Sequence, residues 1–213
     1  MKVSVIVPVY NAQAYLEECF RSLTEQTLWN KEEEGMELIF VNDASEDDSL
    51  EMLRHFRMIA PDRITVINLE ENHGPGGARN AGISVAKGDY IAFMDSDDLI
   101  QPEMYERLYD TAVMENNMTD VVDSGVANEA DGTVRFYTTK ETAGNSDARK
   151  KSLQLLNVGY VWSRIYRRNF ICENHIVFRE NAVMEDQDFL SEVIVRAENT
   201  SFVEEAFYFY RNI

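Results

Sequence analysis

Short apolar runs alternate with amphipathic stretches over residues 1–100. The runs expected to form strands are residues 3–9, 37–41, 64–69 and 90–94. Almost wholly apolar segments of this length are typical of strands that are buried on both faces. The segments with apolar residues at helical spacing are 16–23, 50–56 and 75–86. Strand and helix therefore alternate through short connections, which predicts a parallel sheet with right-handed crossovers.

Local signals mark the starts of two of these helices. Ser45 and Asp48 have the spacing of a capping box ahead of the second helix. Pro75 suits the first turn of the third helix, within a glycine-rich segment that begins at Gly74. Together with the alternating pattern, these signals predict a Rossmann-like α/β architecture that binds nucleotides.

The pattern changes after residue 100. The elements expected there are a helix near 102–116, a strand at 120–126, a turn at 131–132 into a strand at 133–138, a helix at 152–156, and closing strands at 202–203 and 207–210. A polar loop at 140–147 and a short apolar segment at 160–162 lie between them. A further helix is expected from the inward stripe formed by residues 186, 189, 190, 193, 194 and 197. Asp186 holds the first position of this stripe, so its carboxylate should point toward a cleft or the core.

Polar side chains gather where each strand of the first half is expected to end. They are Tyr10, Asp43, His73 and the acidic run from Asp95 to Asp98. In an open α/β sheet, ligands bind outside the carboxyl ends of the strands. Oxygen ligands set this closely suit a hard divalent cation, Mg²⁺ or Mn²⁺, which also binds substrate phosphates.

Structural alternatives stand beside these interpretations. The acidic run would also suit a solvated turn before a helix that starts at Pro102, although Ile100 in place of glycine at the sixth loop position excludes an EF-hand. Tyr10 would also suit a core aromatic position, and Arg79 a surface position.

Composition narrows the function further. The chain has 213 residues, enough for one large domain, and 20 Lys and Arg against 38 Asp and Glu give it a net charge of −18. This charge argues against nucleic acid or an anionic membrane surface as a partner. An anionic substrate would need a metal or a local basic pocket. The two distant cysteines fit a reduced cytosolic setting, and neither a signal peptide nor an apolar run of roughly 18 residues is expected.

Six motifs then carry a resemblance to a known family. They are V-S-V-I-V-P-V-Y-N-A, F-V-N-D-A-S-E-D-D-S, N-H-G-P-G-G-A-R-N-A-G, G-D-Y-I-A-F-M-D-S-D-D, V-W-S-R-I-Y-R-R and M-E-D-Q-D-F. In this order and spacing, over roughly residues 2–211, the chain resembles family-2 glycosyltransferases with the GT-A fold. It looks like the bacterial branch that builds capsular, O-antigen or exopolysaccharide chains.

The resemblance implies an inverting, metal-dependent transfer of a sugar from a nucleotide diphosphate donor, usually linked to UDP, to an acceptor hydroxyl. In a single domain, residues 1–100 would bind the nucleotide-sugar and residues 101–213 the acceptor, a saccharide or lipid-linked saccharide. The expected location is the cytoplasm, with peripheral association at the inner face of the membrane left open. Many relatives continue for tens of residues beyond the position of Ile213, so a truncated C-terminus is expected.

The resemblance also implies roles for individual residues. Those implied for donor binding are Pro8, Tyr10, Asp43, Gly76, Arg79, Asp95 and Ser96, with Tyr10 stacking on uracil and Asp43 accepting its ring N–H. Asp97 would be the principal ligand of Mn²⁺ or Mg²⁺, with Asp95 beside it and Asp98 as a second ligand or a helix cap. Asp186 would be the catalytic base.

One departure and three alternatives remain. Arg164 stands where the family often has lysine, so contacts to the donor phosphate or the acceptor are expected to differ. A haloacid dehalogenase phosphatase would carry its nucleophile after the first strand, and a dinucleotide dehydrogenase would carry G-x-G-x-x-G there. This chain has neither. A non-catalytic module that binds nucleotide-sugars is the alternative that stays open.

Overall fold

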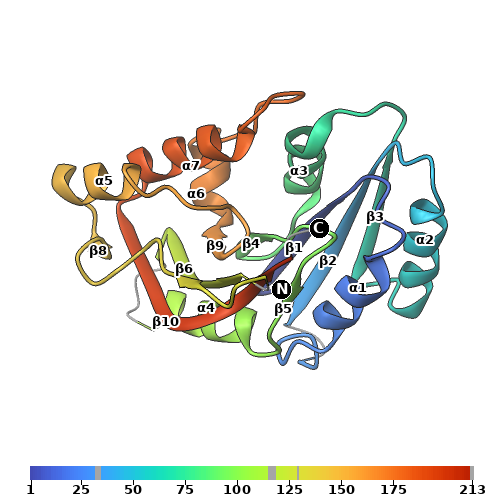
Figure 1. The fold of residues 1–213 in the computed structure, drawn as a ribbon, viewed down its shortest axis with the longest axis horizontal. Coiled ribbons are helices and arrows are strands. Elements are labelled where there is room, and N and C mark those ends of the chain that lie inside the picture. The colour runs from blue at the N-terminus through green and yellow to red at the C-terminus, as the bar shows by residue number, and fades with distance from the viewer. Residues whose placement is uncertain (32–34, 115–118, 129, 212–213) are drawn as a thin grey trace.

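The computed structural model describes residues 1–31, 35–114, 119–128 and 130–211. One mixed sheet runs through this part of the chain in the order β3-β2-β1-β4-β9-β6-β10-β5, with β7 paired to β6 and β8 to β10 (Figure 1). Its strands are β1 (Val3–Val9), β2 (Met36–Asp43), β3 (Ile64–Leu69), β4 (Tyr90–Phe93), β5 (Leu99–Ile100), β6 (Val121–Asn128), β7 (Val134–Arg135), β8 (Gly144–Asn145), β9 (Arg164–Arg167) and β10 (Asn199–Tyr210). The helices are α1 (Leu16–Thr24), α2 (Ser49–Ile59), α3 (Gly74–Val85), α4 (Met104–Val113), α5 (Ala148–Leu155), α6 (Arg168–Glu173) and α7 (Glu185–Arg196).

The first half forms the parallel part of the sheet, as predicted. β1 pairs in parallel with β2 and β4, and β2 pairs in parallel with β3. All of β2 is buried, as is β1 apart from Pro8. The strands are buried on both faces because α1 and α2 lie on one side of them and α3 on the other (Figure 1). The predicted Rossmann-like α/β fold is confirmed.

The second half is joined to the first by an antiparallel strand. β9 pairs antiparallel with β4 on one side and with β6 on the other. β10 then runs parallel to β6, with register shifts between Phe202 and Ala206 and between Ala206 and Tyr208. The two predicted closing strands are therefore one long strand, whose pairing with β6 lapses at Glu204 and Glu205 and resumes in a shifted register.

Other boundaries in this half also differ from the prediction. The strand expected at 133–138 is only the two-residue β7, and the polar loop at 140–147 contains β8. α5 begins earlier than predicted because Asp147 caps it, accepting hydrogen bonds from the backbone N–H groups of Arg149 and Lys150. The helix expected at 102–116 is α4, and residues 115–116 lie outside the described residues.

The predicted capping box at Ser45 is wrong. α2 begins after Asp48, and no side chain caps it. The Ser45 hydroxyl instead accepts a hydrogen bond from the Asn11 backbone N–H at 3.0 Å. Ser45 therefore ties the loop after β2 to the loop after β1, and Pro75 occupies the first turn of α3 as predicted.

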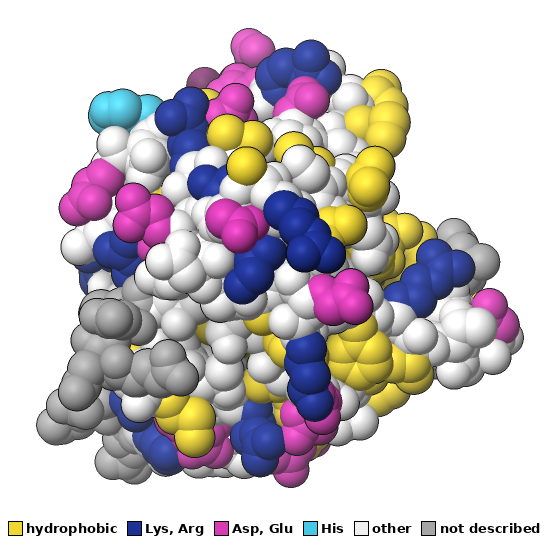
Figure 2. Space-filling model, turned by 90° about the vertical axis from the view of Figure 1, so that its left-hand side faces the viewer, with side chains coloured by type: hydrophobic (Ala, Val, Ile, Leu, Met, Phe, Trp, Pro, Cys, Tyr) yellow, Lys and Arg dark blue, Asp and Glu magenta, His cyan; other side chains and the backbone are white. Residues whose placement is uncertain are grey.

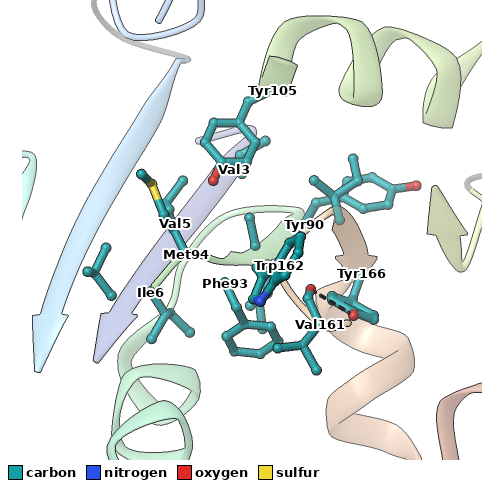
Figure 3. Close-up of a cluster of buried hydrophobic side chains, with 14 of the residues drawn as sticks. Val3, Val5, Ile6, Tyr90, Phe93, Met94, Tyr105, Val161, Trp162 and Tyr166 are labelled. Atoms are coloured by element: carbon teal, nitrogen blue, oxygen red, sulfur yellow. Dashed lines mark hydrogen bonds between the residues drawn. The ribbon is translucent and has the colours of Figure 1, made fainter. Parts of the chain in front are cut away.

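An aromatic core fixes the second half against β4. Figure 3 shows Phe93 of β4 beside Tyr166, with ring centroids 5.6 Å apart. The Tyr166 hydroxyl donates to the Val161 carbonyl at 2.9 Å. The Phe93 ring also lies edge-on to Phe189 of α7, with centroids 5.7 Å apart. Because this contact holds α7 against the sheet, it sets the position of the acidic first turn of that helix.

The surface is mixed in charge. On the face that Figure 2 shows, basic and acidic side chains are interspersed, so the net charge of −18 is not gathered into one patch there. Among the described residues, the helices are too short or too polar for any of them to cross a membrane.

Candidate active site

A cavity of about 880 Å³ lies where β1, β2 and β4 end and where α3 and α7 begin. Eight of the nine predicted site residues line it: Pro8, Tyr10, Asp43, Arg79, Asp95, Ser96, Asp97 and Asp186. The carboxyl ends of neighbouring parallel strands meet at one edge of a sheet, which explains why residues so far apart in sequence converge. We call Pro8, Tyr10, Asp43, Asp95 and Asp97 the strand-end residues.

The loops after β1 and β2 form one side of the cavity. Tyr10 is 52% exposed, so the alternative that it is a core aromatic is wrong. Asp43 is buried, and one of its oxygens accepts the His73 backbone N–H at 2.8 Å. An exposed ring and a carboxylate held by the backbone thus share this part of the wall.

Arg79 is a buried bridge between α3, β4 and α7. It is only 4% exposed, which excludes a surface role. Its Nη2 donates to Asp95 Oδ1 and its Nη1 to Glu185 Oε1, both at 2.9 Å. Burial lowers the pKa of the guanidinium, but the two carboxylates outweigh burial and raise it. Its Nε is buried without a hydrogen-bond partner in the described ranges, so the guanidinium is not fully satisfied.

Gly76 is the one predicted site residue that does not line the cavity. A Cβ at this position would lie 2.4 Å from the Arg179 carbonyl oxygen and 3.2 Å from Glu185 Cγ. The glycine is therefore needed for α3 to pack against the segment that leads into α7. The glycine does allow a close approach to its backbone, but the group that approaches is the segment around Arg179 and Glu185.

The acidic run after β4 divides into two partly buried carboxylates and one fully buried one. Asp95 and Asp97 line the cavity, whereas Asp98 is 1% exposed. Asp98 accepts hydrogen bonds from the Tyr208 hydroxyl at 2.7 Å and from the Arg211 backbone N–H at 2.8 Å. Desolvation by burial is the main cause that raises the pKa of Asp98 to about 7. The predicted helix-cap role is wrong, because α4 begins after Glu103.

The residues present suit a divalent cation shared with a substrate. Within the described ranges, no cluster of three or more His, Cys, Asp or Glu is arranged to hold a metal by itself. Mg²⁺, however, is commonly held by one or two carboxylates together with substrate phosphates. Asp97 and Asp95 offer such carboxylates, and burial followed by repulsion from Asp95 raises the pKa of Asp97. A bound cation would relieve that repulsion, so the donor set fits.

The end of β10 also reaches the acidic run. Arg211 Nε donates to the Asp97 carbonyl, and Arg211 Nη1 forms an ion pair with Glu18 at 2.5 Å. The Tyr208 hydroxyl accepts the Asp95 backbone N–H at 3.2 Å. These contacts were not predicted, although the alternation of Tyr208 and Tyr210 along a strand would have placed both on one face.

Asp186 lies in the first turn of α7 and faces the cavity, where the inward stripe had placed it. Its Oδ1 accepts the Gln187 backbone N–H at 2.8 Å. Burial is the largest cause that raises the pKa of Asp186, the charge of Glu185 also raises it, and Arg79 lowers it. A carboxylate whose pKa is raised is a better proton acceptor than an ordinary one.

Arg164, which stands where the family often has lysine, does not line this cavity. It is buried, with its Nε 3.1 Å from Asp123 Oδ2 and its Nη2 donating to the Val158 carbonyl at 2.8 Å. The Ser163 hydroxyl and the Thr138 hydroxyl donate to the same aspartate. Arg164 therefore holds the loop before β9 in place.

Besides the acidic first turn of α7, the second half of the chain contributes aromatic side chains to the cavity. Tyr160, Trp162 and Tyr210 line it, and Tyr208 packs behind Trp162. We call these four residues the aromatic stack. Sequence reasoning did not assign any of them to the site, because their alignment depends on contacts between two distant segments.

Comparison with known proteins identifies the family. The family model described as Glycosyl transferase family 2 matches residues 4–175. The chain belongs to glycosyltransferase family 2. The expected resemblance is confirmed.

This family 2 chain is similar to several bacterial relatives. EpsH of Bacillus subtilis (strain 168) is 35% identical over 98% of this chain and 60% of its own length. The poly(ribitol-phosphate) beta-glucosyltransferase of Bacillus spizizenii is 30% identical over 99% of this chain and 32% of its own length. A crystal structure of S. aureus TarS residues 1–349 with UDP-GlcNAc matches with a TM-score of 0.83 and 30% identity, over 100% of this chain and 59% of that one. The chain thus spans about 60% or less of these relatives.

Proposed function

We propose that this protein is a metal-dependent, inverting glycosyltransferase that moves a sugar from a UDP-linked donor to an acceptor hydroxyl during surface polysaccharide synthesis. The observation that carries the proposal is that the strand-end residues and Asp186 line one cavity. The likeness to a TarS structure that holds UDP-GlcNAc supports the choice of UDP. The proposed location is the cytoplasm, at the inner face of the membrane when the acceptor is lipid-linked.

The strand-end residues would hold the nucleotide. The exposed Tyr10 ring offers a stacking surface for a base, worth about 1–3 kcal/mol in comparable sites. Asp43 has one oxygen engaged by His73, so its other oxygen can accept an N–H from the base. Arg79, already paired with two carboxylates, would offer a diphosphate only part of its charge.

A cation held by Asp97 and Asp95 would stabilise the negative charge that develops on the leaving diphosphate. The chain's own residues would supply the rest of the chemistry. Asp186 Oδ1 is engaged by the Gln187 N–H, which leaves Oδ2 to take the proton of the acceptor hydroxyl as it attacks. Glu185 is committed to Arg79 and is not available as a base. With one base and no carboxylate acting as nucleophile, a single displacement inverts the anomeric centre.

Calorimetric titration with UDP tests the donor and the metal together. We expect binding in the presence of Mn²⁺ that weakens at least tenfold on addition of EDTA or in Asp97→Ala, because the cation would link the carboxylate to the diphosphate. Equal UDP affinity with and without metal would contradict the metal-dependent proposal.

Donor turnover separates the enzyme from the alternative of a binding module. UDP release from a panel of UDP-sugars should require Mn²⁺ or Mg²⁺ and should rise when an acceptor is added. Tight, metal-dependent UDP binding without any turnover would favour the module.

A further inference from the structure

The aromatic stack is a layered arrangement of rings. Tyr160 lies parallel to Trp162, with centroids 4.6 Å apart and an interplanar angle of 7°. The next layer is Tyr208, 4.0 Å from Trp162 at 16°. Tyr210 lies beside the stack, at 5° to Trp162 and 11° to Tyr160. The four rings thus share nearly one orientation, although they come from two segments of the chain.

The stack has a buried end and an open end. Trp162 and Tyr208 are buried and belong to the core, whereas Tyr160 is 38% exposed. Tyr137 packs edge-on against Tyr160, with centroids 5.8 Å apart. A rigid aromatic side chain is thus presented at the cavity, supported from behind by two other rings. Large aromatic surfaces in a cavity are typical of binding sites.

Hydrogen bonds tie the loop that carries Tyr160 to the candidate base. Arg164 donates to the Val158 carbonyl, and the Gln187 side-chain amide donates to the Gly159 carbonyl at 3.0 Å. Gln187 follows Asp186 in α7, and its backbone N–H holds the Asp186 carboxylate. The open end of the stack and the candidate base are therefore positioned by the same residue.

The charge of the cavity restricts what can bind beside Asp186. Its charged lining consists of one arginine, Arg79, and five carboxylates: Asp43, Asp95, Asp97, Glu185 and Asp186. Arg79 is already paired with two of them. The cation proposed beside Asp97 and Asp95 would be engaged by the donor diphosphate, so a phosphate on the acceptor would meet like charges without a further free cation among the lining residues.

We propose that the aromatic stack is the acceptor subsite and that it takes a pyranose ring of a neutral saccharide. The apolar C–H face of the pyranose would pack on Tyr160, while a ring hydroxyl reaches Asp186 Oδ2. This inference rests on the proposed function and deepens it. A neutral pyranose acceptor would differ from poly(ribitol-phosphate), the acyclic, anionic polymer for which one relative is named.

Saturation-transfer NMR with UDP and Mn²⁺ present tests the subsite. The probes are methyl β-D-glucopyranoside, methyl β-D-galactopyranoside and methyl N-acetyl-β-D-glucosaminide, with ribitol 5-phosphate as the anionic comparison. Saturating the protein's aromatic protons should label the C–H protons on one face of at least one glycoside, and ribitol 5-phosphate should receive less.

Three variants make the test specific. Tyr160→Ala should weaken glycoside binding about tenfold, in the range of one aromatic contact, while UDP affinity stays within twofold. Tyr160→Phe keeps the ring and should bind glycosides as the wild type does. Phe136→Ala removes a partly exposed aromatic ring that does not line this cavity, so it should change neither affinity.

Several results would overturn the subsite. They are wild-type protein that binds UDP but none of the glycosides, preference for ribitol 5-phosphate, or unchanged glycoside binding in Tyr160→Ala. A wild-type protein that does not bind UDP at all would instead overturn the proposed function, and the subsite with it. Because UDP and saccharides are measured separately, the two failures are distinguishable.

Discussion

The strand-end residues and the aromatic stack form two parts of one cavity by different means. The strand-end residues lie at or just after the carboxyl ends of parallel strands, and hydrogen bonds between neighbouring strand ends, such as that from the His73 N–H to Asp43, hold them. The aromatic stack combines a loop before β9 with the end of β10, and it depends on buried contacts such as that between Arg164 and Asp123. The direction of the strands therefore determines where the strand-end residues lie, whereas packing between distant segments determines where the aromatic stack lies.

This difference suggests that the two parts can be disturbed separately. Nucleotide binding should survive changes to α7 and to the aromatic stack, whereas transfer should not. Arg79 is the exception, because it pairs with Asp95 on one side and Glu185 on the other. Asp186 lies in α7 but is not one of the two carboxylates that Arg79 pairs with, so a change there should separate binding from transfer most cleanly.

Asp186→Asn should give the largest effect. The amide keeps the size of the side chain but cannot take a proton at neutral pH. Transfer should fall about 10²–10⁴-fold, the usual contribution of a positioned general base. UDP affinity, measured by calorimetry with Mn²⁺, should stay within about twofold. Loss of UDP binding together with transfer would assign Asp186 to the phosphate or metal site instead.

The strand-end residues were predictable from the sequence because a residue that follows a parallel strand lies at the carboxyl edge of the sheet. Tyr10, Asp43 and Asp97 each follow an apolar run, and parallel strands bring such positions to one edge. Asp186 was predictable from its place in an inward helical stripe.

The aromatic stack and the role of Arg164 were not predictable in this way. Tyr160 and Tyr210 meet only because β10 pairs with β6, and no local pattern reports that pairing. Arg164 shows its charge in the sequence but not its buried partner Asp123. A glycine at position 76 indicates close packing, but the sequence does not indicate which segment packs against it.

Asp123→Ala should destabilise the fold strongly. It removes the partner of buried Arg164 and the acceptor of the Ser163 and Thr138 hydroxyls. Breaking a buried pair on one side costs about 3–5 kcal/mol, so the free energy of unfolding in urea should fall by that amount. Glu205→Ala, which removes a half-exposed partner of Arg107, is the matched control and should cost about 1 kcal/mol or less. Similar losses in both variants would contradict the role given to Asp123.

Tyr208→Phe should lower the stability by less. Tyr208 contacts both the aromatic stack and the acidic run after β4. It keeps the ring in the aromatic stack but leaves Asp98 Oδ2 and the Asp95 N–H without their partner. Unsatisfied buried groups of this kind cost about 1–3 kcal/mol of unfolding free energy. Tyr210→Phe is the control, because its hydroxyl makes no hydrogen bond within the described part of the chain. Thermal unfolding of the two variants should differ clearly, and equal midpoints would exclude a role for the Tyr208 hydroxyl.

Glu185→Gln should give the smallest effect, a shift in the pH dependence of transfer. Burial and the charge of Glu185 raise the pKa of Asp186, while Arg79 lowers it. Transfer needs the ionised carboxylate, so the rate should fall as pH drops through this raised pKa, at a higher pH than for an ordinary aspartate. Glu185→Gln removes a nearby negative charge and releases Arg79 from one of its two partners.

Both consequences of Glu185→Gln favour the ionised form of Asp186, so the acid limb of the rate profile should move to lower pH.

The raised pKa of Asp186 also determines how the free energy of unfolding depends on pH. A carboxyl group whose pKa is raised by folding contributes stability at low pH that is lost as pH rises through the raised value. In Asp186→Asn, the part of the pH-dependent fall in unfolding free energy that comes from Asp186 should therefore be absent. In Glu185→Gln, that part should be smaller. An acid limb that moves to higher pH in Glu185→Gln would mean that the titrating base is a different group, outside the field of Glu185 and Arg79.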